Sequence, residues 1–314
     1  MIRENPRTLR DYDNAALSPA SVDGRTKCKG CDTIGAMFRA PSLLQRPAAM
    51  AKVIGLLMST AALVRAQCEL LSWQQYGQTR HEFPYVLRLR NLLMFGSRHT
   101  RDPGDAQFAR LEQLWREFAP EAAFSEGGIR PPVRNREDAI RRYGEPGLLR
   151  FLADRDHVTL RSLEPPEHAE AQALAEKFEA PHVKLFYFLR ALSSSAADGG
   201  PMEARRSAAL DSMRHRGLPG RPDSLREVDG YLAEALKLSD AAEVRAAWFD
   251  PTRTDTFLND ISRASSDYRN CHMLRLLIDT SRPGKRVFVV VGGSHVIVQE
   301  KALRSAFKVE PGTR

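Results

Sequence analysis

The stretch Arg286-Val-Phe-Val-Val-Val291 is the strongest strand signal in the chain. It is a short run of β-branched and aromatic residues with no polar position after Arg286, and Gly292-Gly293 ends it. Such runs, closed by glycine, favour a strand over a helix. The fold must therefore supply a sheet that buries this strand.

Four further segments of the sequence predict strands. Residues 85–90 alternate apolar and polar side chains, shorter apolar runs follow at 92–95 and 122–125, and residues 157–163 contain a further predicted strand. Helical spacing appears between them, as in residues 108–118, and over most of residues 167–280. This alternation predicts an α/β fold with a mostly parallel central sheet flanked by helices. We expect a single domain over residues 69–314, with a helical insertion at about 167–280, before the last core strand.

The N-terminal residues differ in character from the rest. Residues 1–49 are rich in Pro, Arg, Asp and Ser and show no apolar periodicity, which predicts disorder. Residues 50–67 combine a basic start, an apolar run and small residues near the end, the pattern of a signal peptide. If that interpretation is right, translation starts at Met37 or Met50 and the protein is exported to the periplasm or secreted. The alternative is an amphipathic helix of a cytoplasmic protein.

Four cysteines bear on the same question. Cys28 and Cys31 have CxxC spacing, but no second pair completes a zinc site, so we assign them no role. Cys68 follows the predicted signal peptide, where it is a candidate for lipidation or for a disulfide with Cys271.

Charge and hydropathy exclude two classes of function. The net charge is +8, but residues 1–67 hold ten Lys/Arg against five Asp/Glu, and the remainder holds 37 against 34. A basic surface for nucleic acid is therefore not indicated. No run reaches the roughly 20 apolar residues that a transmembrane helix needs, so we expect no integral membrane segment in the mature chain. The oligomeric state is left open.

Ionisable residues collect just after the predicted core strands. They are His99, Glu126, Glu164 and His295, each within three residues of a Gly or Pro. Because the carboxyl ends of parallel strands share one edge of a sheet, these side chains should meet in one crevice. Two imidazoles and two carboxylates can bind a divalent metal, or act as acid and base without one.

The sequence Gly-x-x-His occurs twice, at residues 96–99 and 292–295. With an intervening Glu at a strand end, these motifs resemble the TraB/GumN and TIKI proteins, with the erythromycin esterases and the haem-binding ChaN proteins as more distant relatives. The resemblance implies that His99, His295 and Glu126 bind a metal such as Mn, Co or Zn. Glu126 is alternatively the general base, Glu164 matches a later acidic position, and Arg269 matches an Arg on the helix before the last strand.

The resemblance implies a metal-assisted hydrolase that cleaves an amide or ester bond in a peptide or small ester. A metal-free variant would use one histidine as the base. The alternative is a ChaN-like protein that binds haem or a metal without turnover. The sequence has no Gly-x-Ser-x-Gly motif, P-loop or GxGxxG motif, so serine-hydrolase and nucleotide-binding functions are not indicated.

Overall fold

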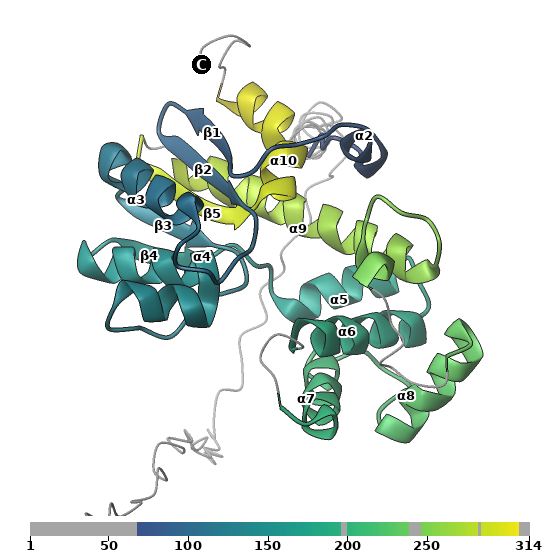
Figure 1. Ribbon diagram of the computed structural model, residues 1–314. Coiled ribbons are helices and arrows are strands. Elements are labelled where there is room, and N and C mark those ends of the chain that lie inside the picture. Colours follow the sequence, from purple (N-terminus) through teal and green to yellow (C-terminus); the bar gives the residue numbers. More distant parts are fainter. Residues whose placement is uncertain (1–67, 196–199, 239–245, 282–283, 308–314) are drawn as a thin grey trace, which may run out of the picture. The chain divides into compact units, whose positions relative to one another are not determined.

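A five-stranded sheet in the order β1-β2-β5-β3-β4 forms the centre of the fold (Figure 1). The computed structural model describes residues 68–195, 200–238, 246–281 and 284–307, all within one compact unit. The strands are β1 (Tyr85–Leu89), β2 (Leu92–Ser97), β3 (Ala122–Ser125), β4 (Thr159–Ser162) and β5 (Val287–Gly292). Strand β1 pairs antiparallel with β2, and all other pairs are parallel. The predicted α/β class with a mostly parallel sheet is confirmed.

Strand β5 lies between β2 and β3, which are far from it in sequence. Its register pairs Gly292 with Ser97 of β2 and Val290 with Ser125 of β3. The carboxyl ends of β2, β5, β3 and β4 therefore lie along the same edge of the sheet. This is the edge of the sheet at which the sequence predicted the ionisable residues to meet.

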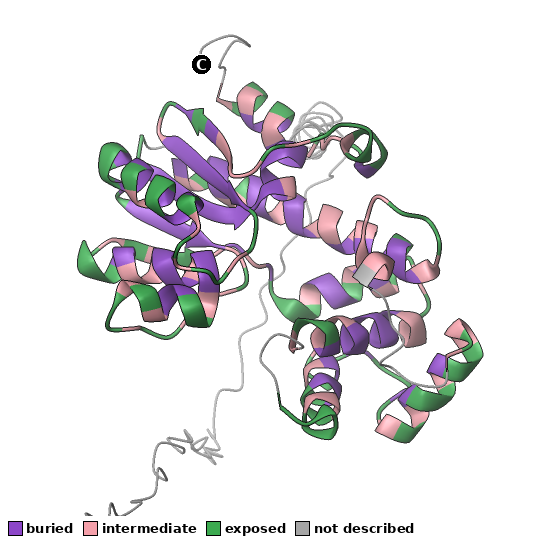
Figure 2. Cartoon of the chain, viewed as in Figure 1, coloured by how far each residue is buried: buried purple, intermediate pink, exposed green. Residues whose placement is uncertain are grey.

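Helices cover both faces of the sheet, and the strands between them are buried (Figure 2). Helices α3 (Ala106–Phe118) and α4 (Arg136–Arg155) pack on the face that carries Phe95 and Phe288. The long helix α9 (Phe257–Ser281) and α10 (Gly293–Ala306) pack on the face that carries Met94 and Val289. The alternation of side chains along each strand produces these two apolar layers.

A helical layer accounts for the predicted insertion. Its elements are α5 (Glu167–Ala175), α6 (Ala180–Ser194), α7 (Met202–Arg214), α8 (Leu225–Tyr231), a π-helical turn (Leu232–Leu236) and a 3₁₀ turn (Ala246–Phe249). They share a separate apolar core with the first half of α9, through Leu258 and Ile261. The second half of α9 packs on the sheet through Met273 and Leu277. Helix α9 thus connects the two cores.

Helix α7 lies within the predicted helical insertion, although its own polar sequence gives only a weak apolar stripe: Ala209, Leu210 and Met213 are its buried residues. Helix α4 has a kink at Gly144, where the backbone has φ 62° and ψ −140°.

The segment before the sheet is fixed to α9. A disulfide joins Cys68 to Cys271, with their Cα atoms 5.4 Å apart, and the Trp73 indole N–H of the short helix α2 (Trp73–Gly77) donates to Asp267 at 2.8 Å. Cys68 is therefore paired in the structure, not available for lipidation. The predicted disorder of residues 1–49 and the predicted signal peptide at 50–67 lie outside the described residues. Among the described helices, none is long and apolar enough to cross a membrane.

Candidate functional site

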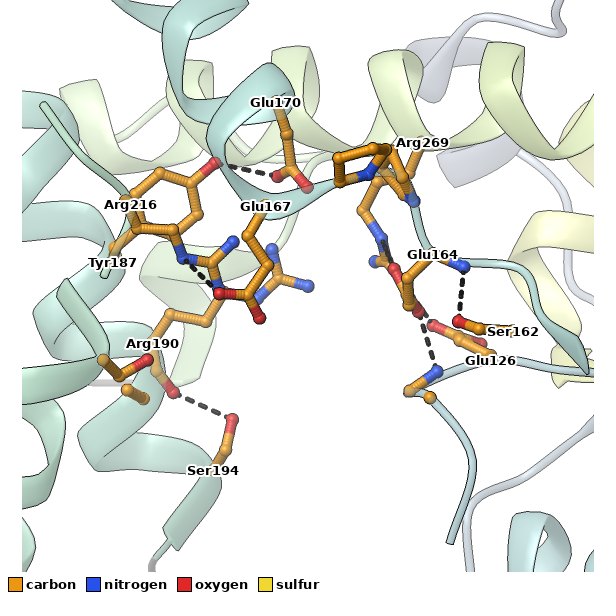
Figure 3. A pocket seen from close by; sticks show the side chains of 16 residues that line it. Glu126, Ser162, Glu164, Glu167, Glu170, Tyr187, Arg190, Ser194, Arg216 and Arg269 are labelled. Atoms are coloured by element: carbon orange, nitrogen blue, oxygen red, sulfur yellow. Dashed lines mark hydrogen bonds and ion pairs between the residues drawn. The ribbon is translucent and has the colours of Figure 1, made fainter. Parts of the chain in front are cut away.

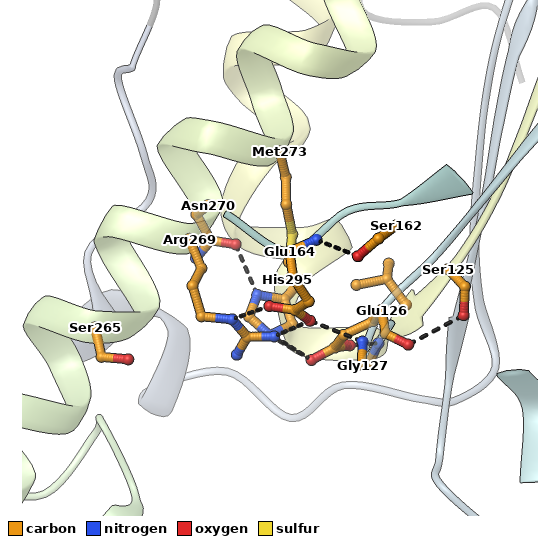
Figure 4. Close-up of polar contacts among 12 residues, drawn as sticks. Ser125, Glu126, Gly127, Ser162, Glu164, Ser265, Arg269, Asn270, Met273 and His295 are labelled. Atoms are coloured by element: carbon orange, nitrogen blue, oxygen red, sulfur yellow. Dashed lines mark hydrogen bonds and ion pairs between the residues drawn. The ribbon is translucent and has the colours of Figure 1, made fainter. Parts of the chain in front are cut away.

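The site lies at the carboxyl edge of the sheet, where four strand ends and α9 meet. His99 follows β2, Glu126 directly follows β3, Glu164 follows β4, and His295 lies in the first turn of α10 after β5. Arg269 projects from α9 toward the two carboxylates, as Figure 4 shows. The strand ends and α9 thereby supply all five residues that the sequence singled out.

The guanidinium of Arg269 joins the two carboxylates. Its Nε donates to Glu164 Oε2 at 2.9 Å, and its Nη2 donates to Glu164 Oε1 at 2.8 Å and to Glu126 Oε1 at 2.9 Å. The exposed fractions of the Arg269, Glu126 and Glu164 side chains are 7%, 17% and 26%. Among the described residues, Arg269 Nη1 makes no hydrogen bond, so its two N–H groups are available to a ligand.

Glu126 also contacts the second Gly-x-x-His motif. Its Oε2 accepts a hydrogen bond from the backbone N–H of Gly292 at 2.6 Å, and its Oε1 lies 3.3 Å from His295 Nε2. The other ring nitrogen, His295 Nδ1, lies 2.7 Å from Asn270 Oδ1, which also accepts from Gln299. With the Asn270 amide oxygen as the acceptor, His295 Nδ1 is the donor in this contact. Glu126 and Asn270 therefore fix the imidazole from both sides.

Electrostatic interactions keep Glu126, Glu164 and Arg269, which together form the Glu126 cluster, ionised. Burial by itself raises the pKa of Glu126, but His295, Arg269 and His99 together hold that pKa well below its usual range. Burial likewise opposes ionisation of Glu164, and the Arg269 guanidinium outweighs it and lowers the pKa of Glu164. The two carboxylates in turn raise the pKa of Arg269 despite its burial. At neutral pH the cluster contains two carboxylates and one guanidinium, all charged.

His99 belongs to a second polar group on the other side of Glu126. Its Nδ1 lies 3.8 Å from Glu145 Oε2, and the buried Glu145 is held by the backbone N–H of Thr100 and by Gln107, both at 2.9 Å. The Glu145 carboxylate raises the pKa of His99 and Glu126 adds to this; partial desolvation opposes both, although 64% of the His99 side chain is exposed. His99 also has a left-handed backbone with φ 52°, a conformation that non-glycine residues rarely adopt and that is frequent at functional sites.

Gly292 explains why the two Gly-x-x-His motifs meet. A Cβ placed on Gly292 would lie 2.7 Å from His99 Nε2 and 3.3 Å from Glu126 Oε2. His99 Nε2 and Glu126 therefore approach the same point on the backbone, and only glycine leaves space for both. The structure thus brings His99, Glu126 and His295 together around the end of β5.

Two cavities open on the two sides of Glu126 and Gly127. The larger, of about 700 Å³, is lined by Glu164 and Arg269 and extends to the helical layer; the smaller, of about 390 Å³, is lined by His99 and Glu145. Both volumes are in the range typical of small-molecule sites. Glu126 is therefore accessible to ligands from either side.

Sequence reasoning missed Glu145 and Asn270 as site residues. Glu145 lies in a helix, at the kink next to Gly144, and only the fold brings it to His99. Asn270 directly follows Arg269, so a signal was present, but helix geometry alone does not show that it reaches His295.

The predicted metal ligands do not form a metal site as they lie. Among the described residues, no group of three or more His, Cys, Asp or Glu side chains is arranged to hold a metal. The cation that faces Glu126 and Glu164 is Arg269, and the second Glu126 oxygen accepts from Gly292. A metal bound to Glu126 Oε1, His295 and His99 would have to compete with the guanidinium. The residues present thus fit a metal-free site better.

No protein-family model, curated protein or solved structure matches the chain. The function is therefore inferred from the residues of the site and their geometry.

Proposed function

We propose that the protein is a hydrolase that cleaves an ester or amide bond at the His99–Glu126–His295–Arg269 site without a metal. The observation that carries this proposal is the position of His99, paired with Glu145, beside an ionised carboxylate that binds a second histidine and an arginine. His99 as a base and Arg269 as a donor to the developing oxyanion are two components of acyl transfer to water, and they line adjoining cavities on the two sides of Glu126.

His99 is the general base in this proposal. Its Nε2 takes a proton from a water molecule as the water oxygen attacks the carbonyl carbon, and later gives that proton to the leaving alcohol or amine. The Glu145 carboxylate, 3.8 Å from Nδ1, stabilises the imidazolium that forms by its negative charge, as the carboxylate of a Ser-His-Asp triad does. Because Glu145 raises the pKa of His99, the protonated intermediate is favoured near neutral pH.

Arg269 stabilises the negative charge that develops on the carbonyl oxygen. Its free Nη1 supplies two N–H groups, and its other nitrogens are fixed by Glu126 and Glu164, so the guanidinium does not reorganise during the reaction. Glu126 has a pKa too low for an efficient base at neutral pH. Its proposed role is to hold Arg269 and His295 in place.

Export is a separate part of the proposal. The Cys68–Cys271 disulfide supports it, because disulfides persist in oxidising compartments and are rare in the cytosol. The substrate class proposed from the resemblance is a peptide or a small ester.

The metal-assisted reaction and ChaN-like haem binding remain predictions of the resemblance. One experiment separates them from the proposal. Purified protein, spanning residues 68–314, is assayed on a panel of nitrophenyl esters and anilides before and after chelator treatment, and its absorbance is recorded with and without added haem. We expect hydrolysis that the chelator does not change.

The variants His99→Gln and Glu126→Gln test the assigned roles, with His168→Gln as the matched control, because His168 is exposed and lines neither of the two cavities. We expect the first two to lose activity and the control to retain it. Loss of activity on chelation, restored by Mn, Co or Zn, would instead establish the metal-assisted reaction. Stoichiometric haem binding without hydrolysis would establish the binding protein.

A further inference from the structure

The wall of the larger cavity opposite the Glu126 cluster carries two arginines. Arg190 comes from α6 and Arg216 follows α7, and Figure 3 shows both across the cavity from Arg269 and Glu164. The two walls differ in how their arginines are neutralised: Arg269 is bonded to two carboxylates, whereas Arg190 and Arg216 are not.

Arg190 has few partners for a guanidinium in a cavity wall. Among the described residues its one hydrogen bond runs from Nη1 to the Ser265 hydroxyl at 3.2 Å. Ser265 itself donates to Glu170 at 2.6 Å, and the Tyr187 hydroxyl donates to the same carboxylate oxygen at 3.0 Å. Glu170 therefore reaches Arg190 only through the Ser265 hydroxyl, without a direct hydrogen bond to the guanidinium. Burial and the neighbouring Arg269 lower the pKa of Arg190, so a bound anion would stabilise its charged form.

Arg216 is positioned without a direct hydrogen bond at its Nε. Its guanidinium carbon lies 4.2 Å from the centre of the Tyr187 ring, and its Nε is 3.6 Å from Glu167 Oε2. That nitrogen is buried and has no hydrogen-bond partner in the described part of the chain. The Glu167 side chain is 62% exposed, so it can turn to solvent and leave the guanidinium to a ligand. The Tyr187 ring therefore packs against the Arg216 guanidinium in the cavity wall.

We propose that Arg190 and Arg216 form a carboxylate-binding subsite, so that the cavity accepts small anionic substrates such as half-esters or half-amides of dicarboxylic acids. Arginine is suited to this ligand because its planar N–H groups match the two oxygens of a carboxylate. The subsite and the Glu126 cluster line the same cavity of about 700 Å³, so one small molecule can contact both. The position of the scissile bond near Glu126 rests on the proposed function; binding of the carboxylate does not.

Binding is tested first, without turnover. Glutarate and its neutral analogue glutaramide are titrated at constant ionic strength, and the melting temperature of the protein is followed, because a ligand that binds the folded state raises it. We expect glutarate, but not glutaramide, to stabilise the wild type. Arg190→Gln and Arg216→Gln should each weaken glutarate binding by about tenfold, the effect of losing one charge-assisted hydrogen bond.

Arg226→Gln is the control, since it removes the same charge from an exposed position in the helical layer. Arg216→Lys serves as a second variant if Arg190→Gln does not fold. It keeps the charge and loses the fork, and should bind glutarate more weakly than the wild type. Equal stabilisation by glutarate in the wild type and in both glutamine variants would overturn the subsite, as would equal effects of glutarate and glutaramide.

Kinetics then separate the subsite from the reaction. The mono-nitrophenyl ester of glutaric acid is compared with nitrophenyl valerate, a neutral ester of similar size. Arg216→Gln should raise the KM for the anionic ester about tenfold and leave the neutral ester unchanged. If glutarate binding needs the two arginines but Glu126→Gln hydrolyses both esters normally, the subsite stands and the proposed reaction fails. If both esters respond equally to Arg216→Gln, the subsite fails whatever the reaction is.

Discussion

Replacing Arg269 by methionine tests the electrostatic core of the site. The change removes three charge-assisted hydrogen bonds of 2.8 to 2.9 Å and leaves Glu126 and Glu164 facing each other in a partly buried site. Removing one partner of a buried ion pair typically costs 3–5 kcal/mol, and the adjoining cavity keeps water within reach of Glu164. We expect a loss of about 3 kcal/mol in the free energy of unfolding at neutral pH, near the lower end of that range.

The pH dependence of that loss distinguishes repulsion between carboxylates from lost packing. In the wild type the lowered pKa values of Glu126 and Glu164 contribute stability above their unfolded pKa, and this contribution disappears as the pH falls through the folded values. Without Arg269, burial and mutual repulsion raise the pKa of at least one of these carboxylates. Protonation of that carboxylate in acid then removes the repulsion that destabilises the variant. The difference in stability between the two proteins should therefore be greatest near neutral pH and shrink in acid.

Urea denaturation at a series of pH values measures this difference. The control is Arg275→Met, an exposed position on the same helix, which should change stability by less than about 0.5 kcal/mol. In a domain of this size, a loss of about 3 kcal/mol lowers the melting temperature by roughly 6–12 °C. A difference of the same size at every pH would refute the assignment of Arg269 as the counter-charge of the two glutamates.

Three further predictions concern His99, the disulfide and Gly292. His99 must be neutral to act as a base, so kcat/KM should rise as the pH passes through its raised pKa. Glu145→Gln should move this rise in the pH profile to lower pH. A rise at the same pH in the variant would contradict the pairing of His99 with Glu145. Replacing Cys68 and Cys271 by serine should cost about 2–5 kcal/mol in urea unfolding and abolish sensitivity to reductant, whereas unchanged stability would exclude the disulfide. Gly292→Ala should displace His99 and lower kcat/KM by up to about a hundredfold with little change in melting temperature; full activity would show that the close approach is unimportant.

The sequence predicted the sheet because its signals are local. The apolar run of β5 and the alternation in β1 depend on residues next to one another in the chain, and the parallel arrangement follows from helices between strands. The bounds of α7 within the predicted helical insertion could not be predicted, because its short buried stripe is completed by neighbouring helices rather than by its own sequence.

By itself, the sequence determined which edge of the sheet carries the site, since His99, Glu126, Glu164 and His295 all follow strands and parallel strands share their direction. Only the tertiary structure decided how these residues are paired. The placement of β5 between β2 and β3, and the reach of α9 across both cores, put Arg269 between the two carboxylates. Contacts between residues more than a hundred positions apart, such as Arg269 with Glu126, depend on the packing of whole elements, which no local pattern in the chain encodes.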